Sequence, residues 1–600
     1  MKKYTRLLSS SFNNRTIGLI ILNILSIFFE TIGIALIPLF ISILIDPGAI
    51  QLIPFEFIKS FSINLDQKNI ATYGVIFLVI LFIFKNIFSV ILVWYEATFR
   101  ADLNYYIRKL FFSLYLNSPY QLINRYNSSD IIRNIDNETQ DYITNFFLII
   151  KFNKDFLLFI SIFSLLLFVD PLSTLLGISF LLLLLISYFM FFKKILTNIG
   201  EKLLTSKSNL FKWINQSLGS IKEVKISRKE NFVLNKFLKN VKVFENSKKN
   251  RNIIQGLPGI LFELIFVIIA LIIVSIVVSS DNVKTIGVLS LYVVAAVRLL
   301  PIFSKFSSYF TNLRASYPSV LHLNSEFDKL KQYQKNSNQD LKKNLAPQIN
   351  FKKKISIKNV DFSYDETDLK ILKNVNIDIN KEQIIAFVGQ SGSGKTTLIN
   401  LLCGLLKLKE GSIEVDSIKI KTDSENWQKK IGLLSQENYL IDDTIKNNII
   451  FLNEDKEVNN ENLDNAILFS GLNDLIKKLP KGLDTLVGEK GNFLSGGQIK
   501  RLALSRLIYR DPEILILDEF TNSLDFEIED HILESIKKLQ ITKKKTIIMI
   551  THKKNSWSLG TSCSLANTKL SFVSLKISNA RLAASKSSYD LPPIFHVVST

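Results

Sequence analysis

Six long apolar segments lie in the first half of this 600-residue chain. They run from about Ile17 to Ile45, Ala71 to Trp94, Phe147 to Val169, Leu172 to Phe192, Ile260 to Val278 and Thr285 to Phe303. Each is close to the roughly 20 apolar residues that cross a bilayer core, so each is predicted to be a membrane-spanning helix. The first is longer than the apolar core of a signal peptide. An even number of spans places both ends of this region on the same side of the membrane.

Basic residues are concentrated in two of the polar connections between these segments. The connection between the second and third segments carries Arg100, Arg108, Lys109, Arg125 and Arg133. The connection between the fourth and fifth carries nine more between residues 193 and 229, whereas loops 46–70 and 280–284 hold few. The positive-inside rule therefore predicts that the long connections and both termini are cytoplasmic, with the spans in the inner membrane. The same rule explains the formal net charge of +20, so a nucleic-acid partner is not expected.

The two long basic connections have a helical pattern and are too polar to face lipid. We therefore expect the spans to continue into the cytosol as helices. At the far ends lie two short polar turns, near Asn127–Glu138 and Asn215–Ile226. These turns either connect two helices and do nothing more, or they transmit force to another domain.

The remainder of the chain has the composition of a soluble α/β domain after a polar linker, and it contains a phosphate-loop motif. The motif is Gly389, Gln390, Ser391, Gly392, Ser393, Gly394, Lys395, Thr396 and Thr397. It follows a strand-like apolar run and precedes a helix-like one, which is the context that a phosphate loop requires. Lys395 is placed to reach the β- and γ-phosphates, and the Thr396 hydroxyl to bind Mg²⁺. The alternative is an ordinary glycine-rich turn, which this spacing disfavours.

A second apolar run, Ile514–Leu517, ends in the carboxylates Asp518 and Glu519. A buried strand that delivers Asp518 beside the phosphate loop is the Walker B arrangement, in which this aspartate holds Mg²⁺. Glu519 then lies where it can deprotonate the attacking water. Strands alternate with helical segments in this region, which predicts a βαβ architecture with a largely parallel core.

With these motifs in order, the domain resembles the ATPase domain of ABC transporters. The residues Ser495, Gly496, Gly497 and Gln498 look like the signature motif. Tyr364 occupies the place of the aromatic residue that stacks on adenine, and Gln436 matches the loop glutamine that links Mg²⁺ to the membrane domain. Asp525 matches the D-loop, and His552 the switch histidine that contacts the γ-phosphate. The resemblance implies ATP and Mg²⁺ as cofactors, with Glu519 and His552 as catalytic residues.

One phosphate loop and one signature motif imply that two complete ATP sites need two chains. A homodimer is the economical interpretation, and pairing with a different half-transporter is the alternative. The chain thus resembles an exporter-type half-transporter, a multidomain protein with an all-α polytopic membrane domain and an α/β P-loop ATPase domain. We assign residues 1–327 to the membrane domain, 328–350 to a linker and 351–555 to the cytoplasmic ATPase domain. Under this resemblance, the two cytoplasmic turns become coupling helices.

Four charged residues inside the predicted spans are candidates for the transport path, because charges in a membrane are costly. They are Glu30, Lys85, Glu263 and Arg298. Either they form ion pairs that serve folding only, or Lys85 and Arg298 line a path for an anionic group. Short matches around Glu30 and Arg298 resemble bacterial lipid-linked oligosaccharide flippases, which implies a polyprenyl-pyrophosphate-linked saccharide as cargo. Export of a peptide, lipid or drug-like substrate is the alternative, and a non-transporting ABC protein is a third.

Residues 556–600 stop resembling the family. They are rich in Ser, Ala and Leu and hold a single acidic residue, Asp590. We interpret them as the product of a frameshift near Trp557, the alternative being a lineage-specific extension, and the nucleotide sequence decides between them. If the tail is native, we expect the last strands of the ATPase domain to be missing.

Overall fold

The computed structural model divides the chain into two compact units. The first comprises Met1–Ser118 and Leu122–Ser337, and the second comprises Pro119–Gln121 and Asn338–Thr600. The structure describes residues 6–8, 10–45, 67–169, 171–278, 284–342, 349–364, 370–390, 392–422, 424–451, 458–520, 526–551, 570–577 and 595–598.

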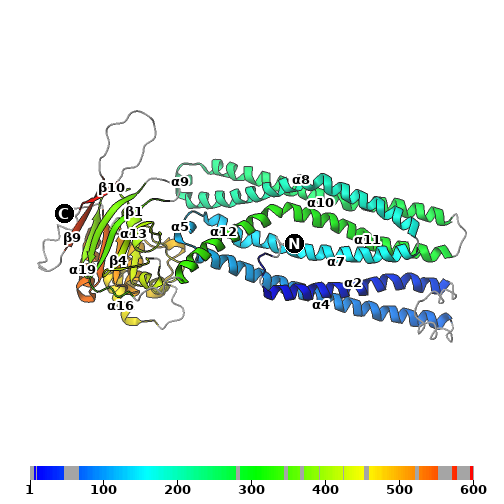
Figure 1. Ribbon diagram of the computed structural model, residues 1–600, viewed down its shortest axis with the longest axis horizontal. Helices are drawn as coiled ribbons and strands as arrows, with labels where there is room; N and C mark the ends of the chain where they lie inside the picture. The colour runs from blue at the N-terminus through cyan, green and yellow to red at the C-terminus, as the bar shows by residue number, and fades with distance from the viewer. Residues whose placement is uncertain are drawn as a thin grey trace, which may run out of the picture. The chain divides into compact units, whose positions relative to one another are not determined.

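The first unit is built of long helices that lie alongside one another (Figure 1). Among the described residues, six helices have 31 to 50 residues, and each contains one of the predicted apolar segments. They are α2 (Ser10–Ile45), α4 (Gln67–Leu116), α7 (Thr139–Val169), α8 (Pro171–Gly219), α10 (Glu230–Val278) and α11 (Lys284–Ala315). α2 packs beside α4 and α8 beside α10, while α11 contacts α2, α7, α8 and α10. The expectation that the spans continue into long helical extensions therefore agrees with the observed helices.

Apolar side chains cover much of the outside of these helices. On α4, Phe77, Ile80 and Ile83 are each more than half exposed. A helix that is apolar on every side requires an apolar surrounding, such as lipid. Within the described residues, three stretches are long and apolar enough to cross a membrane, namely Phe12–Ile37, Thr72–Leu116 and Leu182–Gly219. The spans placed in α7, α10 and α11 stay predictions.

Short helices occupy the two polar turns that the sequence places at the ends of the extensions. The first turn contains α6 (Ser128–Arg133) and a π-helical turn, η2 (Asn134–Glu138), and a short helix, α5 (Tyr120–Ile123), precedes it. The second contains α9 (Ile221–Ile226), where the Ile226 side chain is 83% exposed.

A buried polar network ties the first turn to α12 (Tyr317–Lys342), the helix that follows α11. Arg133 Nη2 lies 3.2 Å from His322 Nε2, which lies 3.2 Å from Asn134 Oδ1. Arg133 Nε is 3.5 Å from Glu138 Oε1. Burial raises the pKa of the Glu138 carboxyl and lowers the pKa of His322. These buried polar contacts therefore attach the first turn to α12.

The second unit contains two sheets. A four-stranded antiparallel sheet has the order β2 (Leu372–Asn380), β1 (Lys354–Phe362), β4 (Glu410–Val415), β5 (Ile418–Lys419). A six-stranded sheet has the order β10 (Phe595–Val598), β9 (Leu570–Ile577), β3 (Ile384–Val388), β8 (Thr546–Thr551), β7 (Ile514–Asp518), β6 (Ile431–Leu434). All its neighbouring strands are parallel except β10 and β9. The predicted α/β class with a largely parallel core is confirmed, and the separate antiparallel sheet is an addition to it.

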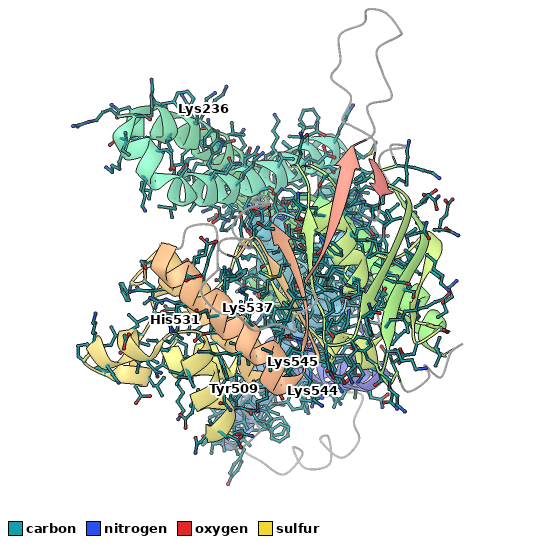
Figure 2. All side chains as sticks on the ribbon, turned by 90° about the vertical axis from the view of Figure 1, so that its left-hand side faces the viewer. Lys236, Tyr509, His531, Lys537, Lys544 and Lys545 are labelled. Carbon is teal, nitrogen blue, oxygen red and sulfur yellow. The ribbon has the colours of Figure 1, made fainter. Side chains whose placement is uncertain are left out.

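Helices fill the space around these sheets. They are α13 (Lys395–Leu402), α14 (Glu425–Gln428), α15 (Ile445–Ile450), α16 (Asn460–Phe469), α17 (Asn473–Lys478), α18 (Gly496–Tyr509) and α19 (Phe526–Lys543). One apolar core includes both sheets and α13, and a second lies under α18 and α19. Figure 2 shows His531 and Lys537 on α19, with Lys544 and Lys545 just beyond its end. The Lys545 ammonium lies 2.8 Å from the Asp511 carboxylate. This ion pair joins the segment after α19 to the segment after α18.

The tail contributes two strands, which corrects the expectation that the last strands would be missing. β9 pairs in parallel with β3, from Leu570 opposite Ile384 to Ser574 opposite Val388. β10 then pairs with β9 in the antiparallel sense. A strand adds to a sheet through its backbone groups, so an apolar alternating run can take this place without the family's usual residues.

Candidate functional site

The phosphate loop begins where β3 ends. All five residues of β3 are buried, and the chain turns at Gly389 before entering α13. Gly392 and Gly394 have φ angles of +80° and +75°, which L-residues rarely adopt. A Cβ at Gly392 would meet no atom within 4 Å, whereas one at Gly394 would lie 2.9 Å from Leu372 Cδ2. Gly392 therefore faces open space where a phosphate can approach the backbone, and Gly394 allows close packing against β2.

Lys395 is folded over the loop that it follows. Its ammonium donates to the carbonyl oxygens of Gly389 at 2.8 Å and Gln390 at 2.9 Å, and to Ser393 Oγ at 3.2 Å. Burial lowers the pKa of Lys395, an effect that the nearby carboxylates Glu519 and Asp518 oppose. The residue is only 5% exposed. The loop thus holds a largely desolvated cation that a phosphate group can pair with.

Oxygen ligands for a hard cation converge beside the loop. The Thr396 hydroxyl, at the start of α13, lies 3.5 Å from Asp518 Oδ2, at the end of β7. Mg²⁺ is usually held by one or two carboxylates together with waters and substrate phosphates. Among the described residues, no group of three or more His, Cys, Asp or Glu side chains could hold a metal ion. A hydroxyl and one carboxylate next to a phosphate loop fit Mg²⁺ bound together with a nucleotide.

Glu519 follows Asp518 in an unusual backbone conformation. Its φ angle is +48°, which places a non-glycine residue in the left-handed region. The Glu519 amide donates to the Ile550 carbonyl of β8 at 3.2 Å. Gln436 Nε2, just beyond β6, donates to Glu519 Oε2 at 3.2 Å. Strained backbone of this kind persists where the surroundings fix it, and it concentrates at active sites.

The signature residues form the N-terminus of α18. Ser495 is the N-cap, and its Oγ accepts from the Gln498 amide at 3.3 Å while Gln498 Oε1 accepts from the Ser495 amide at 2.8 Å. Ser495 and Gly496 are exposed, and a Cβ at Gly496 would meet nothing within 4 Å. The first amides of an α-helix have no acceptor within the helix, and Gly497 lies in this first turn. Such a helix end suits an anion.

Tyr364 follows β1 and packs against the first apolar core. Its ring contacts Phe362, the last residue of β1, with centroids 5.2 Å apart. The Ile371 amide donates to the Phe362 carbonyl at 2.7 Å, and Ile371 itself lies against Gly394. The predicted residues Ser391, Asp525 and His552 lie outside the described residues.

Three of the four charged candidates in the predicted spans meet in one cluster. Glu30 Oε1 lies 3.9 Å from Lys85 Nζ and 3.4 Å from Arg298 Nη1. Glu30 and Lys85 are largely buried, while Arg298 is 40% exposed. Glu263, the fourth candidate, is exposed on α10. Two cations around one carboxylate leave a net positive charge. This arrangement agrees both with ion pairs that serve folding and with a path for an anionic group.

Sequence reasoning missed Lys500. Its ammonium, on α18, lies 3.5 Å from the Glu519 carbonyl oxygen. The signal was its spacing, because residues three and four apart share a helix face and Lys500 lies four residues after Gly496.

Two family profiles match the chain. The profile described as ABC transporter matches residues 372–522, and the one described as ABC transporter transmembrane region matches residues 19–300. The structure resembles that of a bacterial Atm1-family ABC exporter with ATP bound, with a TM-score of 0.73. That likeness covers 91% of this chain and 93% of the other at 19% sequence identity, so it concerns the fold.

Curated relatives match over a shorter stretch. An ATP-dependent lipid A-core flippase of Pasteurella multocida (strain Pm70) is 40% identical over 200 residues, which are 33% of this chain and 34% of the relative. A protein of Staphylococcus aureus (strain NCTC 8325 / PS 47), provisionally named a multidrug export ATP-binding/permease protein, is 39% identical over 201 residues. That match also covers 33% of this chain and 34% of the relative. The matched stretch thus spans about a third of the length of these relatives.

Proposed function

Because this chain belongs to the ABC transporters, with a membrane domain and an ABC ATPase domain, we propose that it is one half of an ATP-driven exporter. Its cargo is a lipid-linked saccharide or another amphipathic substrate. The observation that carries this proposal is the meeting of Lys395, Thr396, Asp518 and Glu519 around one phosphate loop. The same chain contains a unit of long helices with exposed apolar faces. ATP hydrolysis can therefore drive transport across a membrane.

Each residue of the site has a role in ATP hydrolysis. The loop amides and Lys395 bind the phosphates, and Tyr364 stacks on adenine. Thr396, Asp518 and Gln436 would hold Mg²⁺, which neutralises charge on the phosphates. Glu519 takes the proton of the attacking water, and its contact with Gln436 keeps the carboxylate oriented. His552 contacts the γ-phosphate, and Asp525 lies at the junction with the second chain.

The exposed signature end of α18 supports assembly of two chains. Ser495 and the Gly497 amide would bind the γ-phosphate held by a second copy, so that two copies form two complete sites. We propose a homodimer in the inner membrane with the ATPase domains in the cytoplasm. The short helices α6 and α9 are the proposed coupling helices, which transmit movement between the ATPase and the spans.

The cluster around Glu30 supports an anionic cargo. Lys85 and Arg298 share one carboxylate, so a phosphate or pyrophosphate can replace part of their pairing with Glu30. A polyprenyl-pyrophosphate-linked saccharide carries such a group on an apolar tail. The Pasteurella multocida relative is itself named a lipid A-core flippase, which agrees with a lipid cargo for this domain arrangement.

We expect the variant Lys85→Gln/Arg298→Gln to lower the flipping of a lipid-linked saccharide in reconstituted vesicles by at least about tenfold, since two charge-assisted contacts are lost. Basal ATP hydrolysis should stay within about twofold of the unchanged protein. The matched control is Lys236→Gln/Lys239→Gln, which removes two exposed charges from α10. Normal flipping by the first variant would assign the cluster to ion pairing alone.

Export of a peptide, another lipid or a drug-like molecule is the second candidate function. The provisional multidrug name of the Staphylococcus aureus relative favours it. The two candidates differ in which compound stimulates ATP hydrolysis by the purified protein. Stimulation by defined lipid-linked sugars supports the first, and stimulation by peptides or drugs alone supports the second.

A further inference from the structure

We propose that Lys500 is a positioning residue that holds Glu519 for ATP hydrolysis. The inference rests on the proposed function, and it concerns a residue outside the nucleotide-binding motifs. Lys500 lies on α18, 19 residues before Glu519 in the sequence, and its ammonium points to the Glu519 carbonyl oxygen at 3.5 Å.

The backbone of Glu519 needs such support. A φ angle of +48° is unfavourable for a residue with a Cβ, so it persists only where contacts impose it. Three contacts on Glu519 come from three different elements. The Ile550 carbonyl on β8 accepts its amide proton, Gln436 donates to its carboxylate, and Lys500 approaches its carbonyl. Amide, carboxylate and carbonyl are thus each engaged from a separate direction.

Lys500 lies in a partly desolvated setting close to Glu519. The lysine is half-buried, and burial lowers its pKa while the charge of Glu519 raises it. An ammonium in a partly desolvated setting acts on a neighbouring carboxylate more strongly than it would in water. A charged Lys500 therefore attracts Glu519 and helps to hold it in place.

The helix gives this contact a part in the reaction cycle. Lys500 lies about 7.5 Å along α18 from Ser495, because a helix rises about 1.5 Å per residue. Under the proposed function, Ser495 binds the nucleotide of the second chain, so binding there acts on the same rigid helix that reaches Glu519. A separation of 3.5 Å is long for a hydrogen bond, and catalytic hydrogen bonds often shorten only in the complex with substrate. Lys500 thus links the partner's nucleotide to this chain's own general base.

The test compares Lys500→Met, Lys500→Gln and Lys500→Arg in the purified full-length protein, with ATP hydrolysis and binding of a fluorescent ATP analogue measured. We expect kcat to fall by about 10- to 100-fold in the Met and Gln variants, as for a displaced catalytic group. Because Lys500 is not among the residues proposed to bind the nucleotide, KM for ATP and the binding affinity should stay within about twofold. Lys500→Arg keeps the charge and should keep most of kcat. Lys538→Met, which removes an exposed lysine of α19, should leave kcat unchanged.

A double variant separates positioning from a general structural effect. If Lys500 acts only through Glu519, Glu519→Gln/Lys500→Met should be no slower than Glu519→Gln alone, since residues that act as a unit are not additive. Unchanged kcat in both neutral variants would overturn the inference, and so would a loss confined to ATP affinity. If the protein without substitutions hydrolyses ATP and Glu519→Gln does not, either of these two results refutes the role of Lys500 and leaves the proposed function standing. A folded but inactive unchanged protein refutes the proposed function with it.

Discussion

The substitution Glu519→Gln is expected to lower ATP turnover by roughly 10²- to 10⁴-fold, the usual contribution of a general base. An amide has nearly the same shape as a carboxylate but cannot accept the proton of the attacking water. Its oxygen can still accept from Gln436 Nε2, which lies 3.2 Å from Glu519 Oε2, so the site keeps its geometry. Nucleotide affinity should therefore stay within about threefold. Phosphate release and equilibrium binding of ATP check the two expectations separately.

A matched control is Glu534→Gln, which makes the same chemical change at an exposed position of α19. It should leave turnover unchanged. Residual turnover of Glu519→Gln above a tenth of the unchanged rate would mean that another group accepts the proton. A large fall in ATP affinity would instead show that Glu519 mainly supports the nucleotide-binding loop.

The second large effect is expected at Trp427, which is completely buried between the sheets. Its indole N–H donates to the Leu402 carbonyl at the end of α13, at 2.7 Å. Trp427→Ala should destabilise the ATPase unit by about 3–5 kcal/mol, because it removes a large side chain from a packed core. Loss of this support should also loosen α13, whose first residues are proposed to bind phosphate. Hydrogen exchange of the α13 amides and ATP binding against denaturant concentration measure both consequences.

Trp427→Phe separates packing from hydrogen bonding. Phenylalanine fills much of the same space but leaves the Leu402 carbonyl without its donor, so a smaller cost of about 1–3 kcal/mol is expected. Leu468→Ala, at a position of α16 that is 55% exposed, should change stability by less than about 0.5 kcal/mol. Equal stability of Trp427→Ala and Leu468→Ala would contradict the assignment of Trp427 to the core.

Much of the ATPase site could be predicted because its motifs are local. The phosphate loop requires a strand, a turn with positive φ angles and a helix in immediate succession. An apolar run, glycines and a helix-like run predict these three parts in the same order. Likewise, Ser495 and Gln498 have the spacing of a capping box, which fixes the start of α18. Each of these features depends on neighbours within a few residues.

The parts that could not be predicted depend on contacts between distant segments. The approach of Lys500 to Glu519 requires α18 to pack against the six-stranded sheet. The left-handed backbone of Glu519 cannot be predicted from its residue type. From the sequence, Glu30, Lys85 and Arg298 could be predicted as separate candidates for the transport path. Only the packing of the helices brings Glu30 into contact with the other two. Hydropathy locates a span but does not give its rotation about its own axis.

The pairing of β9 with β3 has a consequence for unwanted strand pairing at this side of the sheet. β3 ends in the phosphate loop, and β9 occupies the flank of β3 that faces away from β8. With that flank open, a row of backbone N–H and C=O groups next to the nucleotide site would be a template for any foreign strand. Backbone hydrogen bonding does not discriminate among sequences, so a tail that departs from the family's pattern can still pair with this flank. The tail thus moves the edge of the described sheet from β3, beside the phosphate loop, to β10.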